Sequence, residues 1–468
     1  MKKILIFMLA VLSFGLVLFS PVSYAASTEF NIIFSGSEVT ESDIEKDISD
    51  FVYGEDASVY DDSGLRVDRT AGTDGEYRAR DYIEAYIKGV YGISAEENST
   101  ADGLFGVVKQ EVTYQTSITS QARTSYNVIA IQKSNIDTTD YVVVGAHYDN
   151  FYGYATSLYG SGASKSHGIY DNASGVASLM NVIKLMKDKN LPFDVYYVFF
   201  GAEECGNYGA EGFYQGFVKK YAGDMKLMIN LDSIGNGDNL YMYADEVKTL
   251  HESYYGELNS KLTTSYDFCE TIKTAPKNKK VNYMASSGSV GYSHMGLASD
   301  NNQFIGKGNN VITFFSGAWD DANAIGITES SKNDNLMHTN NDSLDKVKEL
   351  YGDVFFRRIK QVTYLVANSL VQDDFLSMLN ESSKTSGNYV FFTNSFYANL
   401  IFAALLTVGL VIFLLCIKKY KVTANVESLQ TLREAVLDNN IDVIEDSPNK
   451  KFTDKIEKEI IIDDDDKK

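Results

Sequence analysis

Apolar runs with the composition of strands alternate with helical patterns along the middle of the chain. Five runs are rich in β-branched and aromatic residues, which predicts buried strands. They lie at 127–131, 141–147, 195–200, 227–231 and 311–315. Helical spacing of apolar residues predicts helices at 77–90 and 176–183 and a long closing helix over 345–372. The alternation predicts an α/β domain with a mixed, mostly parallel central sheet and helices on both faces.

The strand run at 141–147 ends in a histidine, and an acid follows two residues later. In an extended chain His147 and Asp149 share a face, so Asp149 can fix the ring tautomer that a metal-binding histidine needs. A buried histidine hydrogen-bonded to a carboxylate explains this pair at least as well. Asp171, which precedes the helix at 176–183, is by itself explained as a helix N-cap.

Acids also follow the next two strand runs. Glu203 and Glu204 come after the run at 195–200, and Asp232 comes after the run at 227–231. Two adjacent carboxylates are costly there unless they are solvated or bound to a cation. In a metallohydrolase, one glutamate binds the metal and its neighbour takes a proton from water that the metal activates. Because ligands in open α/β sheets lie at the carboxyl ends of strands, these strand ends predict a single crevice.

The candidate residues belong to motifs that follow one another along the chain. The motifs are His147-Tyr-Asp149, Asp171-Asn-Ala-Ser-Gly175, Glu203-Glu204, Asn230-Leu-Asp232 and His338-Thr-Asn-Asn-Asp342. In this order they resemble the aminopeptidase-type di-zinc exopeptidases, numbered twenty-eight among the metallopeptidase families. That family has relatives with glutamate carboxypeptidase and glutaminyl cyclase activity. The resemblance covers residues 66–370 and implies a zinc-exopeptidase fold.

The resemblance also implies five metal ligands and two zinc ions per chain. Asp171 would bridge the two ions. His147 and Asp232 would complete the site of one ion, and the second would be completed by Glu204 and His338. Oxygen and imidazole donors without thiolate suit zinc, with cobalt or manganese as substitutes.

The catalytic groups follow from the same resemblance. Glu203 would be the general base, and Asp149 would orient a ligand histidine. Two positions depart from the family pattern. Met337 stands where relatives often carry a tyrosine that helps to hold the oxyanion, which leaves Tyr292 as a candidate donor. Asn301 stands where the family has histidine, which leaves the substrate pocket undefined.

Both ends of the chain have the patterns of membrane-targeted proteins. Residues 1–25 combine a basic start, an apolar run and a small-residue cleavage site, which predicts a secretory signal peptide, with an uncleaved anchor as the alternative. Residues 26–65 are acidic with little periodicity, and a propeptide, an extra strand and a spacer all stay open for them. The exopeptidase domain is expected at 66–385. The apolar residues 398–417, followed by lysines, predict a transmembrane helix rather than a buried core helix, and 418–468 an acidic cytoplasmic tail.

The chain is strongly acidic, with a net charge of −21 and a pI near 4.7. This argues against nucleic-acid binding, because phosphate contacts need clustered lysine and arginine. The signal peptide and the C-terminal helix together predict a catalytic domain outside the cell and a C-terminus inside. The low cysteine and proline content, with the secretory leader, suggests a bacterial surface protein. We therefore expect a membrane-anchored, extracytoplasmic zinc aminopeptidase that acts on peptides or proteins, with its oligomeric state undetermined. A carboxypeptidase or glutaminyl cyclase on the same scaffold, and a metal-free surface receptor, stay as alternatives.

Overall fold

The computed structural model describes most of the central part of the chain. The described residues are 30–54, 68–115, 121–151, 166–219, 224–245, 248–265, 271–274, 280–284, 290–294, 299–305, 309–319, 327–328 and 336–380. By compactness the chain divides into Met1–Asn31 and Ile32–Lys468, and every element below lies in the second unit. The predicted signal peptide, the predicted membrane helix at 398–417 and the tail at 418–468 lie outside the described residues. None of the helices described here has the length and apolar character needed to cross a membrane.

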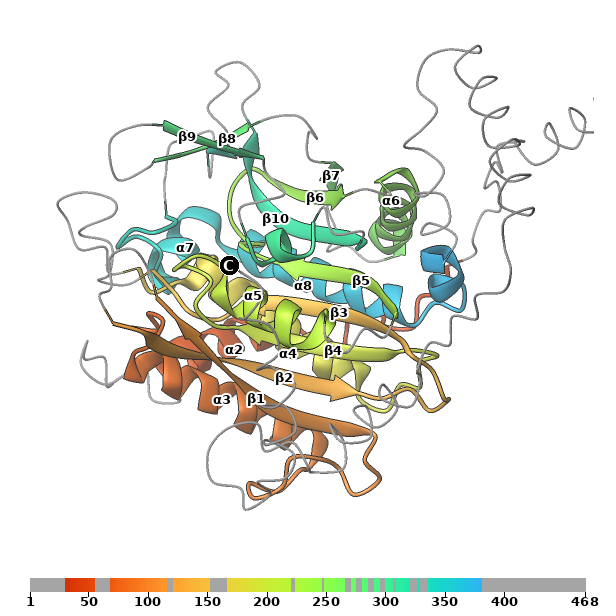
Figure 1. Cartoon of the computed structure of the whole chain (residues 1–468). Coiled ribbons are helices and arrows are strands. Elements are labelled where there is room, and N and C mark those ends of the chain that lie inside the picture. Colours follow the sequence, from red (N-terminus) through yellow and green to blue (C-terminus); the bar gives the residue numbers. More distant parts are fainter. Residues whose placement is uncertain are drawn as a thin grey trace, which may run out of the picture. The chain divides into compact units, whose positions relative to one another are not determined.

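A nine-stranded sheet organises the second unit (Figure 1). The strand order is β1-β2-β4-β3-β5-β10-β6-β7, with β11 paired to β10. The strands are β1 Phe105–Tyr114, β2 Arg123–Gln132, β3 Asp140–His147, β4 Asp194–Phe200, β5 Asp224–Leu231, β6 Asn239–Asp245, β7 Lys273–Thr274, β10 Val311–Trp319 and β11 Ile327–Thr328. A separate pair is formed by β8 Lys280–Met284 and β9 Val290–His294.

The direction of the strands changes from the centre of the sheet to its sides. β4, β3, β5 and β10 pair in parallel, whereas β1 and β2 on one side and β6 on the other join by antiparallel pairing. The prediction of a mixed α/β sheet is confirmed. Parallel pairing joins the central four strands and also joins β7 to β6, whereas the other pairs are antiparallel. The sheet is therefore mixed but not mostly parallel as predicted.

Helices cover both faces of the sheet, as predicted. They are α2 Glu41–Tyr53, α3 Asp74–Tyr91, α4 Ser174–Met186, α5 Tyr208–Phe213, α6 Lys248–Ser265, α7 Leu344–Tyr351 and α8 Asp353–Leu370, with short turns η2 Ile169–Ala173, η3 Tyr214–Val218 and η5 Asp300–Gln303. α4 contacts β3, β5 and α8, and Figure 1 shows α8 behind the sheet in this view and α5 in front of it. This covering explains why every residue of β3 from Tyr141 to His147 is buried.

The two faces of β3 contribute to different parts of the core. Tyr141 and Val143 pack in one apolar cluster with Phe213 of α5 and with Phe304. Because side chains alternate along a strand, the residues between them point to the face that α4 covers. The same alternation places His147, at the end of the strand, on the face of Tyr141 and Val143.

The closing segment differs from its prediction. A single helix was expected over 345–372, but the structure has two helices, α7 and α8, separated at Gly352. The backbone of Gly352 has φ 54° and ψ −135°, a conformation outside the helical region that a residue without a Cβ adopts most readily. The helical spacing of the apolar residues continues through this break, so the pattern alone could not locate it.

Residues 30–54, whose structure the sequence left open, contain the helix α2. It begins at an N-cap, Thr40, whose side chain accepts a hydrogen bond from the backbone of Asp43. α2 packs on α4 and α8, and Asn181 of α4 donates a 2.8 Å hydrogen bond to Asp47. Asn368 of α8 accepts a 3.1 Å hydrogen bond from the backbone of Phe34. This segment therefore forms part of the same packed layer as the two long helices.

Candidate metal centre

Three strand ends form one side of the candidate site. β3 and β4 are parallel and end side by side, since His147 pairs with Phe200. β5 lies on the other side of β3 and ends at Leu231, directly before Asp232. His147 is therefore the last residue of a buried strand, and Asp232 is the first residue after its neighbour. This register brings together the histidine and the acids predicted at the strand ends.

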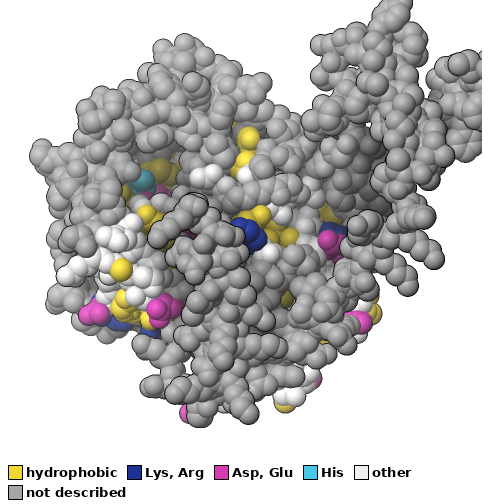
Figure 2. Space-filling view, in the orientation of Figure 1, with side chains coloured by type: hydrophobic (Ala, Val, Ile, Leu, Met, Phe, Trp, Pro, Cys, Tyr) yellow, Lys and Arg dark blue, Asp and Glu magenta, His cyan; other side chains and the backbone are white. Residues whose placement is uncertain are grey.

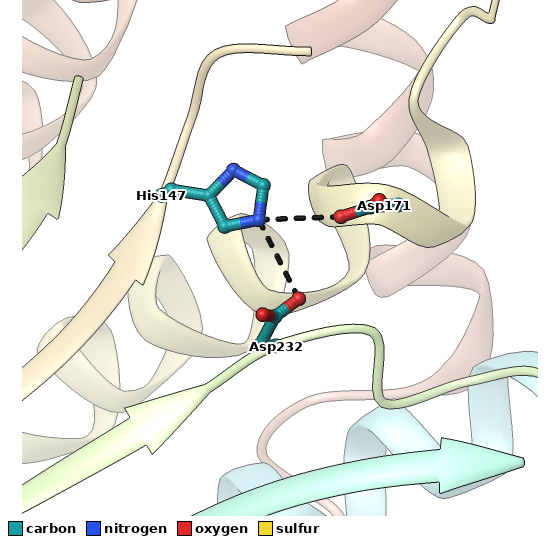
Figure 3. A group of neighbouring side chains, drawn as sticks. All are labelled: His147, Asp171 and Asp232. Atoms are coloured by element: carbon teal, nitrogen blue, oxygen red, sulfur yellow. Dashed lines mark ion pairs between the residues drawn. The ribbon is translucent and has the colours of Figure 1, made fainter. Parts of the chain in front are cut away.

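His147, Asp171 and Asp232 form the first of two clusters (Figure 3). Nε2 of His147 lies 3.2 Å from an oxygen of Asp171 and 3.4 Å from an oxygen of Asp232. In Figure 3 the two carboxylates approach this ring nitrogen from the turn before α4 and from the end of β5. The nitrogen is buried and makes no hydrogen bond within the described part of the chain. A buried nitrogen that faces two carboxylates in this way fits a position for a cation.

Asp171, Glu204 and His338 form the second cluster, which shares Asp171 with the first. Nε2 of His338 lies 3.0 Å from the other oxygen of Asp171 and 3.1 Å from Oε2 of Glu204. Each oxygen of Asp171 therefore faces a different histidine. All five side chains that the sequence singled out as metal ligands meet in these two clusters.

The second cluster is the more open to solvent. The side chain of His338 is 32% exposed, whereas that of His147 is 1% exposed. The ring of Phe151 stacks on His338 with the ring centroids 4.3 Å apart. On the face drawn in Figure 2, a histidine and an acidic side chain lie together. Of the two histidines, His338 is therefore the one that is open to solvent.

The donor set of the two clusters fits zinc. It consists of imidazole nitrogens and carboxylate oxygens, which zinc binds. Oε1 of Glu204, like Nε2 of His147, is buried without a hydrogen-bond partner among the described residues. A metal ion held by these side chains would satisfy both atoms.

A comparison with known proteins decides the family. The model of Peptidase family M28 matches residues 127–361, half of the chain. The chain belongs to peptidase family M28. The family that the sequence motifs resemble is thus confirmed.

M28 relatives with known names match this chain over part of their length. Leucine aminopeptidase 2 of Trichophyton equinum is 29% identical over 145 residues, which are 31% of this chain and 27% of that protein. Aminopeptidase YwaD of Bacillus subtilis is 24% identical over 229 residues, 48% of this chain and 41% of that protein. The chain thus matches less than half the length of either relative. Among solved structures, BSAP, a zinc aminopeptidase from Bacillus subtilis, is similar with a TM-score of 0.48 at 14% identity, covering 72% of this chain and 96% of that chain.

In this M28 chain Asp149 holds the backbone of the Glu203–Glu204 pair. Its two carboxylate oxygens accept hydrogen bonds from the backbone N–H of Glu203, at 3.1 Å, and of Glu204, at 3.2 Å. One of these oxygens is also 3.6 Å from Nδ1 of His147, and the backbone oxygen of Asp149 is 3.3 Å from that nitrogen. Asp149 therefore makes the predicted contact with His147 through its backbone oxygen as well as its carboxylate. The carboxylate also holds the chain in place after β4.

Burial and neighbouring acids act on the two glutamates. Burial raises the pKa of Glu203 well above its usual value, and the charge of Glu204 adds to this, while His147 opposes it. For Glu204, burial raises the pKa to about 7, with His338 lowering it and Asp171 raising it. Without a cation, burial therefore favours the protonated form of both carboxyl groups, whereas a cation bound beside them would favour the charged form that a general base needs.

The histidines and Asp171 form a charge-coupled group. Burial by itself lowers the pKa of His147, but the nearby carboxylates, Glu203 first among them, raise it well above its usual value. His338 behaves in the same way, with Glu204 as the main charge that raises its pKa. Burial raises the pKa of Asp171, and the close contacts and charges of both histidines outweigh this and lower it. The carboxylates of the centre therefore favour the protonated form of both histidines, and a bound cation would compete with those protons.

Three chain junctions of the centre have a left-handed backbone at a residue other than glycine. These residues are Ala202 with φ 54°, Ser233 with φ 56° and His338 with φ 58°. Such conformations cost about 1–3 kcal/mol each and persist where the surrounding structure enforces them. Ser233 and His338 lie beside or at proposed ligands, and Ala202 lies beside Glu203, the predicted general base. Functional sites are where such strain is concentrated.

Two residues of the motifs have structural roles that the sequence did not reveal. Asp342 accepts hydrogen bonds from the backbone N–H of Tyr170, at 2.7 Å, and of Asp171, at 3.2 Å. Asn172 donates to the backbone oxygen of Leu231, at 3.0 Å, and accepts from the N–H of Ser233, also at 3.0 Å. Both side chains fix the turn that carries Asp171, and their membership in the motifs was the only signal that pointed to them.

Asp300 is a site residue that sequence reasoning missed. It is fully buried, and neither carboxylate oxygen has a hydrogen-bond partner among the described residues. Burial raises its pKa well above the usual value, with His147 lowering it and Asp232 raising it. Its neighbour Asn301, noted for its departure from the family motif, donates a 2.6 Å hydrogen bond to Thr313 of β10. The side chain of Tyr292, the candidate oxyanion donor, lies outside the described part.

Proposed function

We propose that this chain is an aminopeptidase that holds two zinc ions and removes N-terminal residues from peptides. The observation that carries the proposal is the position of Asp171, whose two oxygens face His147 and His338 in separate clusters. One carboxylate shared by two ligand groups suits a pair of ions. Glu203 is adjacent in sequence to a ligand of the second cluster and is almost fully buried.

The residues of the centre have separate roles in peptide hydrolysis. Zinc, when bound, supplies a Lewis acid that polarises the scissile carbonyl and lowers the pKa of water. Glu203 takes a proton from the attacking water and passes it to the nitrogen of the leaving amine as the C–N bond breaks. Asp149 keeps Glu203 and Glu204 in register through their backbone amides.

The relatives support an aminopeptidase over a carboxypeptidase, since Leucine aminopeptidase 2 and Aminopeptidase YwaD are both aminopeptidases by name.

We place the catalytic domain outside a bacterial cell, anchored by the helix proposed at 398–417. The support is the secretory pattern of residues 1–25 and the lysines that follow the apolar run. An epitope fused after residue 468 tests this orientation in intact cells. It should bind antibody only after the cells are permeabilised, and binding without permeabilisation would refute the orientation.

The activity is tested on the full-length chain in detergent. Elemental analysis should give about two zinc ions per chain, as a pair of sites requires. A peptide with a free N-terminus should be cleaved, its N-acetylated counterpart should not, and amidation of the C-terminus should make no difference. Glu203→Gln should keep the zinc and lose the cleavage.

Each alternative function predicts a different result in the same assay. Dependence on a free C-terminus would identify a carboxypeptidase. Cyclisation of an N-terminal glutamine without cleavage would identify a glutaminyl cyclase. A chain that takes up no zinc on reconstitution and cleaves no peptide would refute the enzyme and favour a metal-free receptor.

A further inference from the structure

We propose that Asn207 is a positioning residue for Glu203, whose carboxylate it holds through one oxygen so that the other exchanges the proton. The side-chain Nδ2 of Asn207 donates a 3.1 Å hydrogen bond to Oε1 of Glu203. This inference rests on the proposed role of Glu203 as the general base. It adds a residue that lies outside the metal ligands and their motifs.

The loop between β4 and α5 is folded so that Asn207 must face Glu203. The backbone N–H groups of Gly206 and Asn207 both donate 2.8 Å hydrogen bonds to the backbone oxygen of Glu203. The N–H of Tyr208 donates to the backbone oxygen of Ala202 at 3.1 Å. These bonds close a tight turn, which brings a residue four positions later back beside the glutamate.

The backbone at Asn207 explains why an asparagine stands there. It has φ 60° and ψ 30°, the left-handed conformation that asparagine adopts more readily than most residues with a side chain. Asn207 is also the N-cap of α5, yet its side chain makes no capping hydrogen bond. At an N-cap, an asparagine side chain commonly accepts a hydrogen bond from the first turn of the helix. Here the side chain of Asn207 instead donates to Glu203.

Holding the carboxylate matters because a glutamate side chain has several rotamers. A base that leaves its productive position by about 1 Å loses much of its effect on rate, even when the substrate binds as before. Glu203 must be charged before it accepts a proton, and in that state the amide of Asn207 donates to a charged acceptor, which makes a stronger bond than one between neutral groups. Loss of this bond is therefore expected to lower kcat and to leave KM unchanged.

Two substitutions distinguish the effect of the Asn207 side-chain amide from the effect of its backbone conformation. Asn207→Gly removes the side chain and keeps a residue that favours the left-handed conformation. It should lower kcat about tenfold, with KM, zinc content and thermal unfolding unchanged. Asn207→Asp keeps the shape but replaces the donor with a second acceptor, and it should lower kcat further. The matched control is Asp188→Gly, an exposed residue with φ 66° after the far end of α4, which should leave kcat unchanged.

A second measurement tests the contact between Asn207 and Glu203 independently of catalysis. Crystal structures of the wild-type and Asn207→Gly proteins should show the Glu203 carboxylate in one position in the wild type. In the variant it should be displaced or in two rotamers. In a Glu203→Gln background, Asn207→Gly should cause no further loss of the residual rate, because the two residues act as a unit.

The outcomes separate this inference from the proposed function. An active wild type whose Asn207→Gly variant has the same kcat would overturn the role of Asn207 alone. An unmoved Glu203 carboxylate in the variant crystal would overturn it as well. A wild type that holds zinc but hydrolyses no peptide would overturn both, since Glu203 would then have no proton to move.

Discussion

Asp149 and Asp342 are buried carboxylates that bind backbone N–H groups, whereas their neighbours face a cation position. Asp149 binds the amides of Glu203 and Glu204, and Asp342 binds the amide of Asp171. A carboxylate that accepts two backbone hydrogen bonds fixes the path of the chain and brings its negative charge close to the centre. At the scale of single residues, the ligands are therefore placed by other acids that do not themselves face the metal.

Asp149→Asn tests this role. The amide nitrogen of the new side chain would meet a backbone N–H, so one of the two hydrogen bonds must break. Zinc affinity is expected to fall about 10- to 100-fold, and kcat to fall with it. Zinc titration of the metal-free protein and a peptidase assay at saturating zinc measure the two effects.

The control for this substitution lies at the other end of the same strand. Asp140 begins β3 and forms an ion pair with Lys226 at 3.3 Å. Asp140→Asn should leave zinc affinity unchanged. If both variants bind zinc as the wild type does, Asp149 has no part in positioning the ligands.

At the scale of elements, α2 supports the segment that leads to Asp171. The guanidinium of Arg69 donates 2.9 Å hydrogen bonds to the backbone oxygens of Tyr148 and His167, and it lies over the ring of Phe51 from α2. Tyr53, the last residue of α2, shares a 3.0 Å hydrogen bond with Nδ1 of His167. Packing of α2 on the domain thus reaches the metal centre through one arginine and one tyrosine.

Arg69→Lys tests the connection between α2 and the centre. A lysine cannot donate to both carbonyl oxygens in the fork geometry of a guanidinium, and a buried oxygen would lose its partner. The free energy of unfolding is expected to fall by about 1–3 kcal/mol, and zinc affinity to fall as well. Urea unfolding and zinc titration give the two values.

Arg80→Lys provides the comparison, because Arg80 lies on α3 with its guanidinium 4.5 Å from the ring centre of Tyr126. It should not change zinc affinity. Equal zinc affinity in the Arg69 variant and the wild type would show that the centre does not depend on α2.

At the scale of the whole molecule, the centre sits where the sheet, both helical layers and the loops meet. Its ligands come from β3, from the turn before α4, from the loop after β4, from the end of β5 and from the segment before α7. A cation at this point would link all of these parts, so metal binding and folding should be coupled.

Zinc should stabilise the fold. At a free zinc concentration about 1,000 times the Kd, the free energy of unfolding is expected to rise by about 4 kcal/mol over the metal-free protein. Thermal or urea unfolding with and without a chelator measures this difference. Asp171→Asn, which weakens both clusters at once, should show little dependence on zinc. Identical unfolding of the wild type with zinc and with chelator would contradict the coupling.

Zinc affinity should rise with pH. The surrounding carboxylates raise the pKa of His147 and His338, so each ring keeps its proton to a higher pH than a free imidazole does when zinc is absent. Zinc needs the neutral ring, so binding must expel these protons, and a lower pH strengthens their competition. Calorimetry in buffers of different ionisation enthalpy should detect proton release that declines as pH rises above the pKa of the histidines. An affinity that is the same at about pH 6 and about pH 8 would refute this.

The sequence by itself determined the strands of the central sheet and the residues at their ends. The runs at 141–147 and 195–200 correspond to β3 and β4 because burial on both faces requires nearly continuous apolar residues, and that requirement is visible in a short stretch of chain. The acids and the histidine that follow the strands were found for the same reason. They interrupt an apolar pattern at a position where only function or solvent explains them.

Only the tertiary structure decided how these residues act on one another. Asp171 faces both histidines, Asp149 holds the amides of Glu203 and Glu204, and Asn207 turns from its helix towards Glu203. Each relation depends on the register between strands or on the backbone conformation of a loop. Such contacts join residues that are distant in the chain or folded back on it, and the spacing of apolar residues carries no information about them.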